Sequence, residues 1–275
     1  MNVDLSTIKS RFPQLLLPIH PNMSTTPEYK DAVLRGNPVL NPVHFPLSES
    51  DTITTVDTPV GTAEILCLVE RECFVRAYQA LCYRCEPVKV PDSVGAVTIW
   101  GLIDWGKIRQ HKAEYLAAGG DDWNVEFKKF TADRKNYTST LILLSAGEYS
   151  NVPAQTVGIE QDEWLNKSLT IRKYHELTHF ICRSLHPERI DAIRDEVLAD
   201  LIGLVAAFGK YDPRLARAFL GIENGSFREG GRLSHYEEEN INVTLSRADT
   251  LITGFAQEIK KYDITDIFEL LLSIF

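Results

Sequence analysis

The pentapeptide His175-Glu176-Leu177-Thr178-His179 is the feature that most constrains this chain. Residues four apart on a helix lie about 40° apart around its axis, so the two histidines emerge side by side on one face. Two neutral imidazoles at this spacing suit a Zn²⁺ ion, and Glu176 then lies beside the metal, where its carboxylate can act as a general base. The pattern predicts a zinc-binding helix; the alternative is a pair of surface histidines that flank an ordinary helical glutamate.

A second helix is predicted directly downstream. Pro187 ends the first helix because proline cannot continue it, and residues 188–208 predict a helix that stops at Gly209. Its apolar stripe consists of Ile193, Val197, Leu201, Leu204 and Val205. Glu196 and Asp200 are again four apart, and an antiparallel helix pair would bring both against the histidines. Glu196 is then expected to be the third zinc ligand, and Asp200 to accept the outer N–H of one histidine and fix its tautomer.

The pattern H-E-x-x-H followed by E-x-x-x-D on the next helix resembles the gluzincin class of zinc metallopeptidases. The form Glu-Val-Leu-Ala-Asp resembles its compact members, the minigluzincins, and the match covers residues 173–209. The zinc ligands that the resemblance implies are His175, His179 and Glu196. It also implies a zincin-like core, a water as fourth ligand, Glu176 as general base, Asp200 as outer support, and a peptide or protein substrate.

Other residues offer less suitable third ligands. Metzincins require H-E-x-x-H-x-x-G-x-x-H, whereas here Cys182 occupies the glycine position and His186 falls one residue late. Asp191 and Asp195 also lie on the predicted second helix, but each is expected to point away from the face that carries Glu196.

A hydrogen-bond donor for the developing oxyanion is the remaining requirement for peptide hydrolysis. His235 and Tyr236 are candidates because they follow a glycine-rich segment and open a predicted helix downstream of the metal pair. We expect His235 to be catalytic together with Glu176, although a solvent-exposed histidine at a helix start is the plainer interpretation. Tyr149 and Arg232 are further candidates.

Composition and charge exclude several classes of function. The net charge of −9 argues against a nucleic-acid partner, which would require clustered Lys and Arg, and disfavours an anionic membrane surface. No apolar run approaches the roughly 18 residues of a membrane span, and the first residues lack a basic leader followed by an apolar segment. The five cysteines favour free thiols in a reducing cytosol, because their number is odd. We therefore expect a cytoplasmic protein without a nucleic-acid or membrane partner.

The order of the expected elements indicates the fold class. Residues 1–56 are rich in Pro, Ser, Thr and Asn and predict an irregular arm, whereas residues 57–275 are expected to form a single zincin-like metallohydrolase domain. Thr58 followed by Pro59 predicts the start of a long helix over residues 59–84. Further helices are expected over residues 104–118, 122–131, 213–221 and 235–261 and from residue 263 onward, with a loop-like segment over 151–167. The many expected helices and few expected strands together predict an α+β, mainly helical fold with a small sheet.

Residues 140–145 form the best candidate for a buried strand. The resemblance implies that a strand upstream of the metal helix lies along the cleft, where its edge can pair with an extended substrate. An ordinary core strand is the alternative.

The leading hypothesis from the sequence is thus a zinc-dependent hydrolase, in particular a metallopeptidase. The main alternative is a non-catalytic binding or regulatory protein with a structural zinc or a degenerate peptidase site. In that case Cys182 or His186 would close the coordination sphere as a fourth protein ligand. A zinc hydrolase of a non-peptide amide is a third hypothesis.

Overall fold

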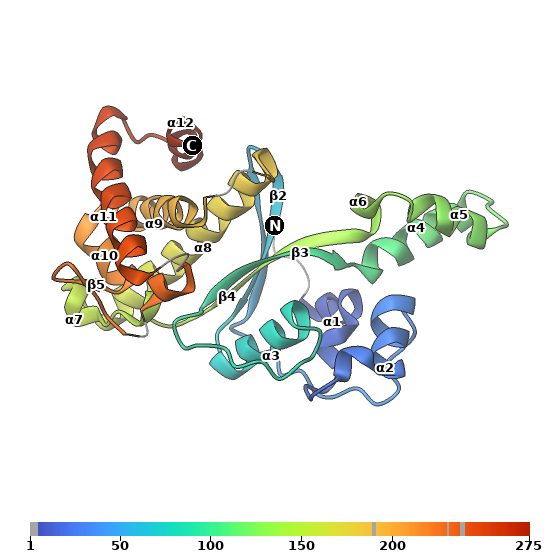
Figure 1. The fold of residues 1–275 in the computed structure, drawn as a ribbon. Helices are drawn as coiled ribbons and strands as arrows, with labels where there is room; N and C mark the ends of the chain where they lie inside the picture. Colours follow the sequence, from blue (N-terminus) through green and yellow to red (C-terminus); the bar gives the residue numbers. More distant parts are fainter. Residues whose placement is uncertain (1–4, 189–190, 230, 237–239) are drawn as a thin grey trace. The chain divides into compact units, whose positions relative to one another are not determined.

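The computed structural model describes residues 5–188, 191–229, 231–236 and 240–275 (Figure 1). The chain divides into two compact units. The first comprises residues up to Thr55, Glu64–Val90 and Thr98–Leu143, and the second comprises Val56–Ala63, Pro91–Val97 and Leu144–Phe275. The fold is α+β and mainly helical, as predicted. None of the described helices is both long enough and apolar enough to cross a lipid bilayer.

One four-stranded sheet has the strand order β1-β2-β4-β3. Its strands are β1 (Thr52–Thr58), β2 (Gly61–Leu68), β3 (Ala96–Ile103) and β4 (Thr138–Ser145). The strand predicted over residues 140–145 is confirmed as β4, and four consecutive side chains in it, Leu141 to Leu144, are buried. β4 is an inner strand, because β2 and β3 pair with it on either side. Of the two interpretations of this strand, the structure therefore supports the core strand.

The helices of the first unit are short. They are η1 (Leu5–Thr7), α1 (Ile8–Arg11), η2 (Pro13–Leu16), η3 (Met23–Thr25), α2 (Pro27–Tyr29), the π-helical η4 (Lys30–Leu34), α3 (Arg71–Cys82), α4 (Trp105–Ala117), α5 (Trp123–Phe130) and α6 (Arg134–Tyr137). Several apolar side chains of the first turns, including Ile8, Phe12, Leu15 and Leu17, are fully buried. The domain boundary near residue 56 stays a prediction.

The long helix predicted over residues 59–84 is wrong in its first half. Pro59 lies in the turn between β1 and β2, and Gly61 closes this turn with φ +123°, a conformation that favours glycine. The helix α3 begins only at Arg71. A threonine followed by proline is as compatible with a turn as with a helix start, and the β-branched residues on both sides favour strands.

The second unit carries the longer helices. They are η5 (Tyr149–Asn151), α7 (Ala154–Val157), α8 (Gln161–Leu185), α9 (Ala192–Phe208), α10 (Pro213–Leu220), η6 (Arg232–Tyr236), α11 (Ile241–Glu258), η7 (Ile259–Lys261) and α12 (Ile267–Ile274), with a two-stranded ribbon of β5 (Ile222–Glu223) and β6 (Ser226–Phe227). The helix that carries His175 and His179 is α8, and the predicted second helix is α9. α9 ends at Gly209 as predicted, in the left-handed conformation typical of a C-terminal glycine.

The predicted starts of three helices agree with the structure, and each of these helices has an aspartate as its N-cap. The helices predicted over 104–118, 122–131 and 213–221 are confirmed as α4, α5 and α10. Their N-caps are Asp104, Asp122 and Asp212, and each carboxylate accepts backbone N–H groups of the first turn.

Three other starts are corrected by the structure. α8 begins at Gln161, inside the segment that was expected to be a loop. α11 begins at Ile241 behind its cap Asn240, and not near residue 235; residues 237–239 of the predicted helix lie outside the described residues. α12 begins at Ile267 behind its cap Asp266, four residues later than predicted. The caps Asn240 and Asp266 accept two backbone N–H groups each, which explains why the helices start there.

α8 and α9 pack along each other as an antiparallel pair (Figure 1). Their register follows from paired positions: His179 with Asp195, His175 with Asp200, Ile171 with Gly203, and Lys167 with Ala207. The helices approach most closely at Gly203, where an added Cβ would lie 2.9 Å from both the carbonyl oxygen and the Cγ2 of Ile171. A glycine at this position allows the approach that brings His175 and His179 of α8 close to the carboxylates of α9.

We expect Gly203→Ala to destabilise the protein by about 1–3 kcal/mol, because the new methyl group overpacks a contact with backbone that cannot move away. Gly254→Ala in α11 is the matched control, since an added Cβ there meets no atom within 4 Å. The control should raise stability by about 0.5–1 kcal/mol, the usual advantage of alanine over glycine in a helix. Urea denaturation of both variants measures the difference. Equal stability of the two variants would show that α8 and α9 are not in tight contact at Gly203.

Candidate metal centre

Two histidines of α8 and one glutamate of α9 converge on a common point. The Nε2 atoms of His175 and His179 are 2.9 Å apart. The carboxylate oxygens of Glu196 lie 3.5 Å from the first and 3.3 Å from the second of these nitrogens. The three ligand atoms all lie within 4.8 Å of one another, and no second group of this kind occurs in the described part of the chain. The structure thus brings together the three residues that the sequence singles out as metal ligands.

The placement of the three side chains follows from the helices that carry them. The histidines are four residues apart on α8, so they share one face. Glu196 lies in the second turn of α9, whose start is fixed by Asp191, an N-cap that accepts the backbone N–H of Arg194. His175 is buried, whereas His179 and Glu196 are half-buried.

Each histidine is held at its outer ring nitrogen by a carboxylate. Asp200 Oδ1 lies 3.0 Å from His175 Nδ1, and Asp195 Oδ2 lies 2.6 Å from His179 Nδ1. An ionised carboxylate can only accept, so each Nδ1 carries the proton and donates it. In the neutral form of each ring, Nε2 then carries the lone pair that can bind a metal.

Asp200 therefore occupies the place expected from the sequence, whereas the expectation for Asp195 is wrong. Asp195 does not point away from the site but contacts His179 from the side opposite Glu196. The register of the helix pair explains this contact. His179 lies level with residues 195 and 196 of α9, so the two neighbouring carboxylates reach the two different nitrogens of one ring.

Ionisable side chains are close together in this buried cluster and shift one another's pKa values. Burial lowers the pKa of His179, but the negative charge of Glu196 and the hydrogen bond to Asp195 outweigh it and raise the pKa well above its usual value. Burial raises the pKa of Glu196, but the charge of His179 outweighs it and holds the pKa well below the usual range. Without a metal, these pKa directions favour an ionised Glu196 and a protonated His179.

Glu176 is buried on α8, with 6% of its surface exposed. Its negative charge contributes to the raised pKa of His179, after burial, Glu196 and Asp195. This electrostatic effect indicates that the Glu176 carboxylate lies near the cluster without belonging to the group of three ligands.

The four candidates for an additional donor differ in position. Tyr149 contacts His175 and Asp200, and Arg232 pairs with Asp200 and donates to the hydroxyl of Tyr149. Tyr236 forms a hydrogen bond with Glu196, and burial followed by the charge of Glu196 raises its pKa well above the usual value. His235, by contrast, is exposed, and its ring contacts that of Tyr236 at a centroid distance of 6.4 Å.

Cys182 and His186 lie outside the group of ligands. Cys182 is fully buried, and its thiol forms a hydrogen bond with Asp195; burial, followed by the charge of Asp195, raises the thiol pKa to about 12. The ring of His186 instead packs near Phe275, with centroids 5.3 Å apart. Among the described residues, the group of side chains that could hold a metal therefore has three members, and neither Cys182 nor His186 is one of them.

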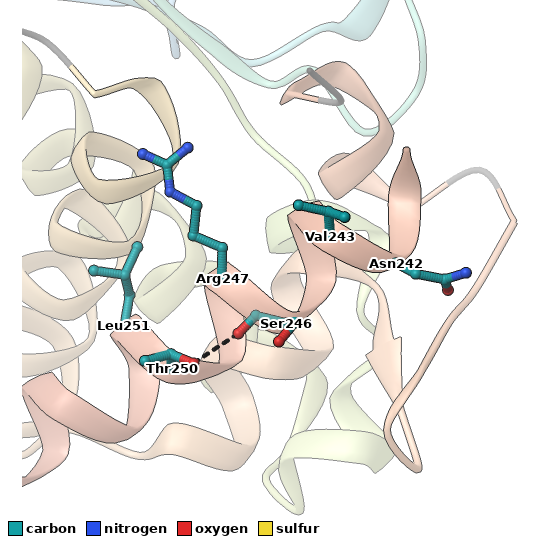
Figure 2. Close-up of a pocket in the computed structure, with 6 residues that line it drawn as sticks. All are labelled: Asn242, Val243, Ser246, Arg247, Thr250 and Leu251. Atoms are coloured by element: carbon teal, nitrogen blue, oxygen red, sulfur yellow. Dashed lines mark hydrogen bonds between the residues drawn. The ribbon is translucent and has the colours of Figure 1, made fainter. Parts of the chain in front are cut away.

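A separate pocket of about 560 Å³ lies along α11 (Figure 2). Its described lining consists of Asn242, Val243, Ser246, Arg247, Thr250 and Leu251. Arg247 forms an ion pair with Asp191, the N-cap of α9. The pocket contains none of the converging ligands, so it adds nothing to the chemistry of the metal centre.

The comparisons with known proteins leave the chemistry to be argued from the site itself. No curated protein and no solved structure matches the sequence. One family model matches residues 2–269, which is nearly the whole chain. The chain belongs to this family, which is described as a family of unknown function (DUF7005).

Proposed function

We propose that this protein is a zinc-dependent hydrolase, specifically a metallopeptidase whose zincin-like metal site is formed by α8 and α9. One observation carries the proposal. The Nε2 atoms of His175 and His179 and the carboxylate of Glu196 converge, while Asp200 and Asp195 hold the two outer ring nitrogens. Neutral histidines held in this way by carboxylates are typical of metal ligands.

The residues present fit a zinc ion. Oε2 of Glu196 is buried and has no hydrogen-bond partner among the described residues, an arrangement that costs free energy unless a cation binds there. Two nitrogen lone pairs that face each other across 2.9 Å also require a proton or a cation between them. Three protein ligands from histidine and carboxylate match catalytic zinc sites, which keep a fourth position for water or substrate.

A zinc ion bound here would lower the pKa of a water molecule and polarise the scissile carbonyl of a peptide or protein substrate. Glu176 would accept the proton of the attacking water and deliver it to the leaving nitrogen. Burial and the charge of Glu196 raise the pKa of Tyr236, which keeps its proton; the hydroxyl would have to exchange its hydrogen bond with Glu196 for one to the developing oxyanion. His235 remains a candidate for the same role from the adjacent, exposed position.

The competing hypothesis of a structural zinc would require a fourth protein ligand. Cys182 and His186, the two candidates for it, both lie outside the ligand group. A structural site also has no use for the buried carboxylate of Glu176 next to the metal ligands. These two observations favour the hydrolase.

Calorimetric titration of the metal-free protein with Zn²⁺ tests the proposal. We expect about one ion to bind per chain, as in other three-ligand zinc sites. The zinc-loaded protein should then cleave members of a broad peptide library, with the products read by mass spectrometry. Absence of zinc binding would refute the metal centre. Zinc binding without cleavage would favour the structural alternative.

Zinc binding should also release about one proton per chain. The raised pKa of His179 means that its ring is protonated at neutral pH in the metal-free protein, and zinc must displace this proton to reach the lone pair. The apparent zinc affinity should therefore increase as the pH rises toward the pKa of His179, and level off above it. Titrations in buffers of different ionisation enthalpy count the released protons. A pH-independent affinity with no proton release would contradict the assignment of His179 as a ligand.

A further inference from the structure

Tyr149 lies behind the proposed ligand His175, in a position that the reaction does not use. Its hydroxyl is 2.9 Å from His175 Nδ1 and 2.7 Å from Asp200 Oδ1, and it accepts a hydrogen bond of 2.8 Å from Arg232. Arg232 also binds Asp200 Oδ2, so each oxygen of this carboxylate has a partner. The four groups form a closed, buried network on the far side of the histidine ring.

Only one arrangement of protons satisfies this network. Arg232 can only donate, so the oxygen of Tyr149 accepts from it and the single hydroxyl proton is free for one other bond. If Tyr149 gave this proton to His175 Nδ1, the ring would carry its own proton on Nε2 and lose the lone pair that binds a metal. The Nδ1 atom and Asp200 Oδ1 would then be two acceptors 3.0 Å apart without a proton between them. The hydroxyl proton therefore goes to Asp200, and Nδ1 donates its own proton to the same carboxylate.

Further contacts hold Tyr149 in place. Arg172 donates to the backbone carbonyl groups of Gly147 and Glu148, which directly precede Tyr149. The guanidinium groups of Arg172 and Arg232 lie 5.8 Å and 5.4 Å from the centre of the tyrosine ring, within the range of cation–π attraction.

The two residues after Tyr149 support the same conclusion. Ser150 and Asn151 have φ angles of 52° and 55°, which non-glycine residues rarely adopt. Ser150 is buried and contacts Arg232. Such unfavourable backbone conformations are kept only where surrounding contacts hold the chain in place. They are found more often at functional sites than elsewhere.

The geometry points to Tyr149 and Arg232 as positioning residues that fix the tautomer and orientation of His175 for metal binding. This inference rests on the proposed zinc site. Neither residue is one of the three converging groups, although Arg232 also pairs with Glu196 Oε2 at 3.9 Å. They act mainly through Asp200, because Tyr149 donates to Oδ1 and Arg232 binds Oδ2, and these two contacts hold the carboxylate in the orientation in which it accepts from His175 Nδ1.

Tyr211 provides a matched control. It is a second tyrosine close enough to Asp200 to experience its charge, but its buried hydroxyl has no hydrogen-bond partner among the described residues. Tyr149→Phe and Tyr211→Phe each remove one oxygen atom, and only the first breaks the network. Arg232→Lys keeps the positive charge but loses the planar fork that reaches Tyr149 and Asp200 together.

The experiment measures the Zn²⁺ affinity of the full chain by competition with a chelator, together with the visible spectrum of the Co²⁺-loaded protein. We expect Tyr149→Phe and Arg232→Lys each to weaken zinc binding by about 10- to 100-fold and to change the cobalt spectrum. Tyr211→Phe should behave like the wild type in both. The double variant Tyr149→Phe/Arg232→Lys should lose no more than the larger single effect, because the two residues act through one network.

Thermal unfolding separates positioning from general stability. The inference requires that Tyr149→Phe keeps a cooperative transition and still loses zinc affinity. A folded Tyr149→Phe protein with wild-type zinc affinity and an unchanged cobalt spectrum would overturn it, as would an equal loss in Tyr211→Phe. A wild-type protein that binds no zinc would overturn the zinc site and this inference together. A wild-type protein that binds zinc, with the same affinity in Tyr149→Phe, would overturn this inference alone.

Discussion

Glu176→Gln is expected to reduce peptide cleavage by at least about 100-fold, the usual contribution of a general base, while zinc binding and stability stay close to those of the wild type. The carboxylate is buried and lies near His179, but it is not one of the three converging ligands. Glutamine keeps the shape and the hydrogen-bonding capacity of the side chain and removes only its ability to accept a proton. The loss should therefore appear in kcat and not in metal content.

The control for this variant is Glu163→Gln on the same helix. The side chain of Glu163 is 54% exposed and pairs with Lys167, so its substitution should leave both cleavage and zinc affinity unchanged. Side-by-side digestion of the peptide library by the wild type and both variants gives the comparison. Undiminished cleavage by Glu176→Gln would exclude Glu176 as the base. Lost zinc binding in that variant would instead make it part of the coordination.

The parts of the site that could be predicted from the sequence depend on short spacings. His175 and His179 share a face because four residues make about one helical turn, and the same spacing relates Glu196 to Asp200. A single further assumption, that the two helices pack antiparallel, brings the two faces together. The chain between the helices is short, which favours antiparallel neighbours.

The role of Asp195 could not be predicted in the same way. Its direction on an isolated helix differs from that of Glu196 by about 100°, which suggests that only one of them can face the site. The structure shows that the ring of His179 lies between them, so that each carboxylate meets a different nitrogen. This depends on the axial register of α8 against α9, which a close contact at Gly203 helps to set. No local pattern in the sequence encodes that register.

Contacts between residues that are distant in the sequence were the hardest to predict. Tyr149 and Arg232 lie 83 positions apart, yet they share one hydrogen bond and the same partner, Asp200. The sequence could only place them among several candidates.

The wrong helix prediction over residues 59–84 has a different cause. Thr58 and Pro59 are compatible with both a turn and a helix start, and only pairing within the sheet decides between them.

The pair Glu196→Gln and Asp195→Asn tests which side of His179 faces the metal. The two residues are neighbours on α9, and both contact the same ring, Glu196 near Nε2 at 3.3 Å and Asp195 at Nδ1 at 2.6 Å. Each substitution removes one negative charge and keeps the size of the side chain. If Nε2 binds the metal, Glu196→Gln removes a ligand, whereas Asp195→Asn removes only the group that orients one.

We therefore expect Asp195→Asn to weaken zinc binding by about 10- to 100-fold and Glu196→Gln to weaken it by clearly more than about 100-fold. Chelator competition measures both constants on the same scale, and urea denaturation of the metal-free variants checks that each protein is folded. A larger loss for Asp195→Asn would reverse the assignment and make Asp195 the third ligand. Equal, small losses would mean that neither carboxylate binds the ion, which would remove the three-ligand site on which the hydrolase proposal depends.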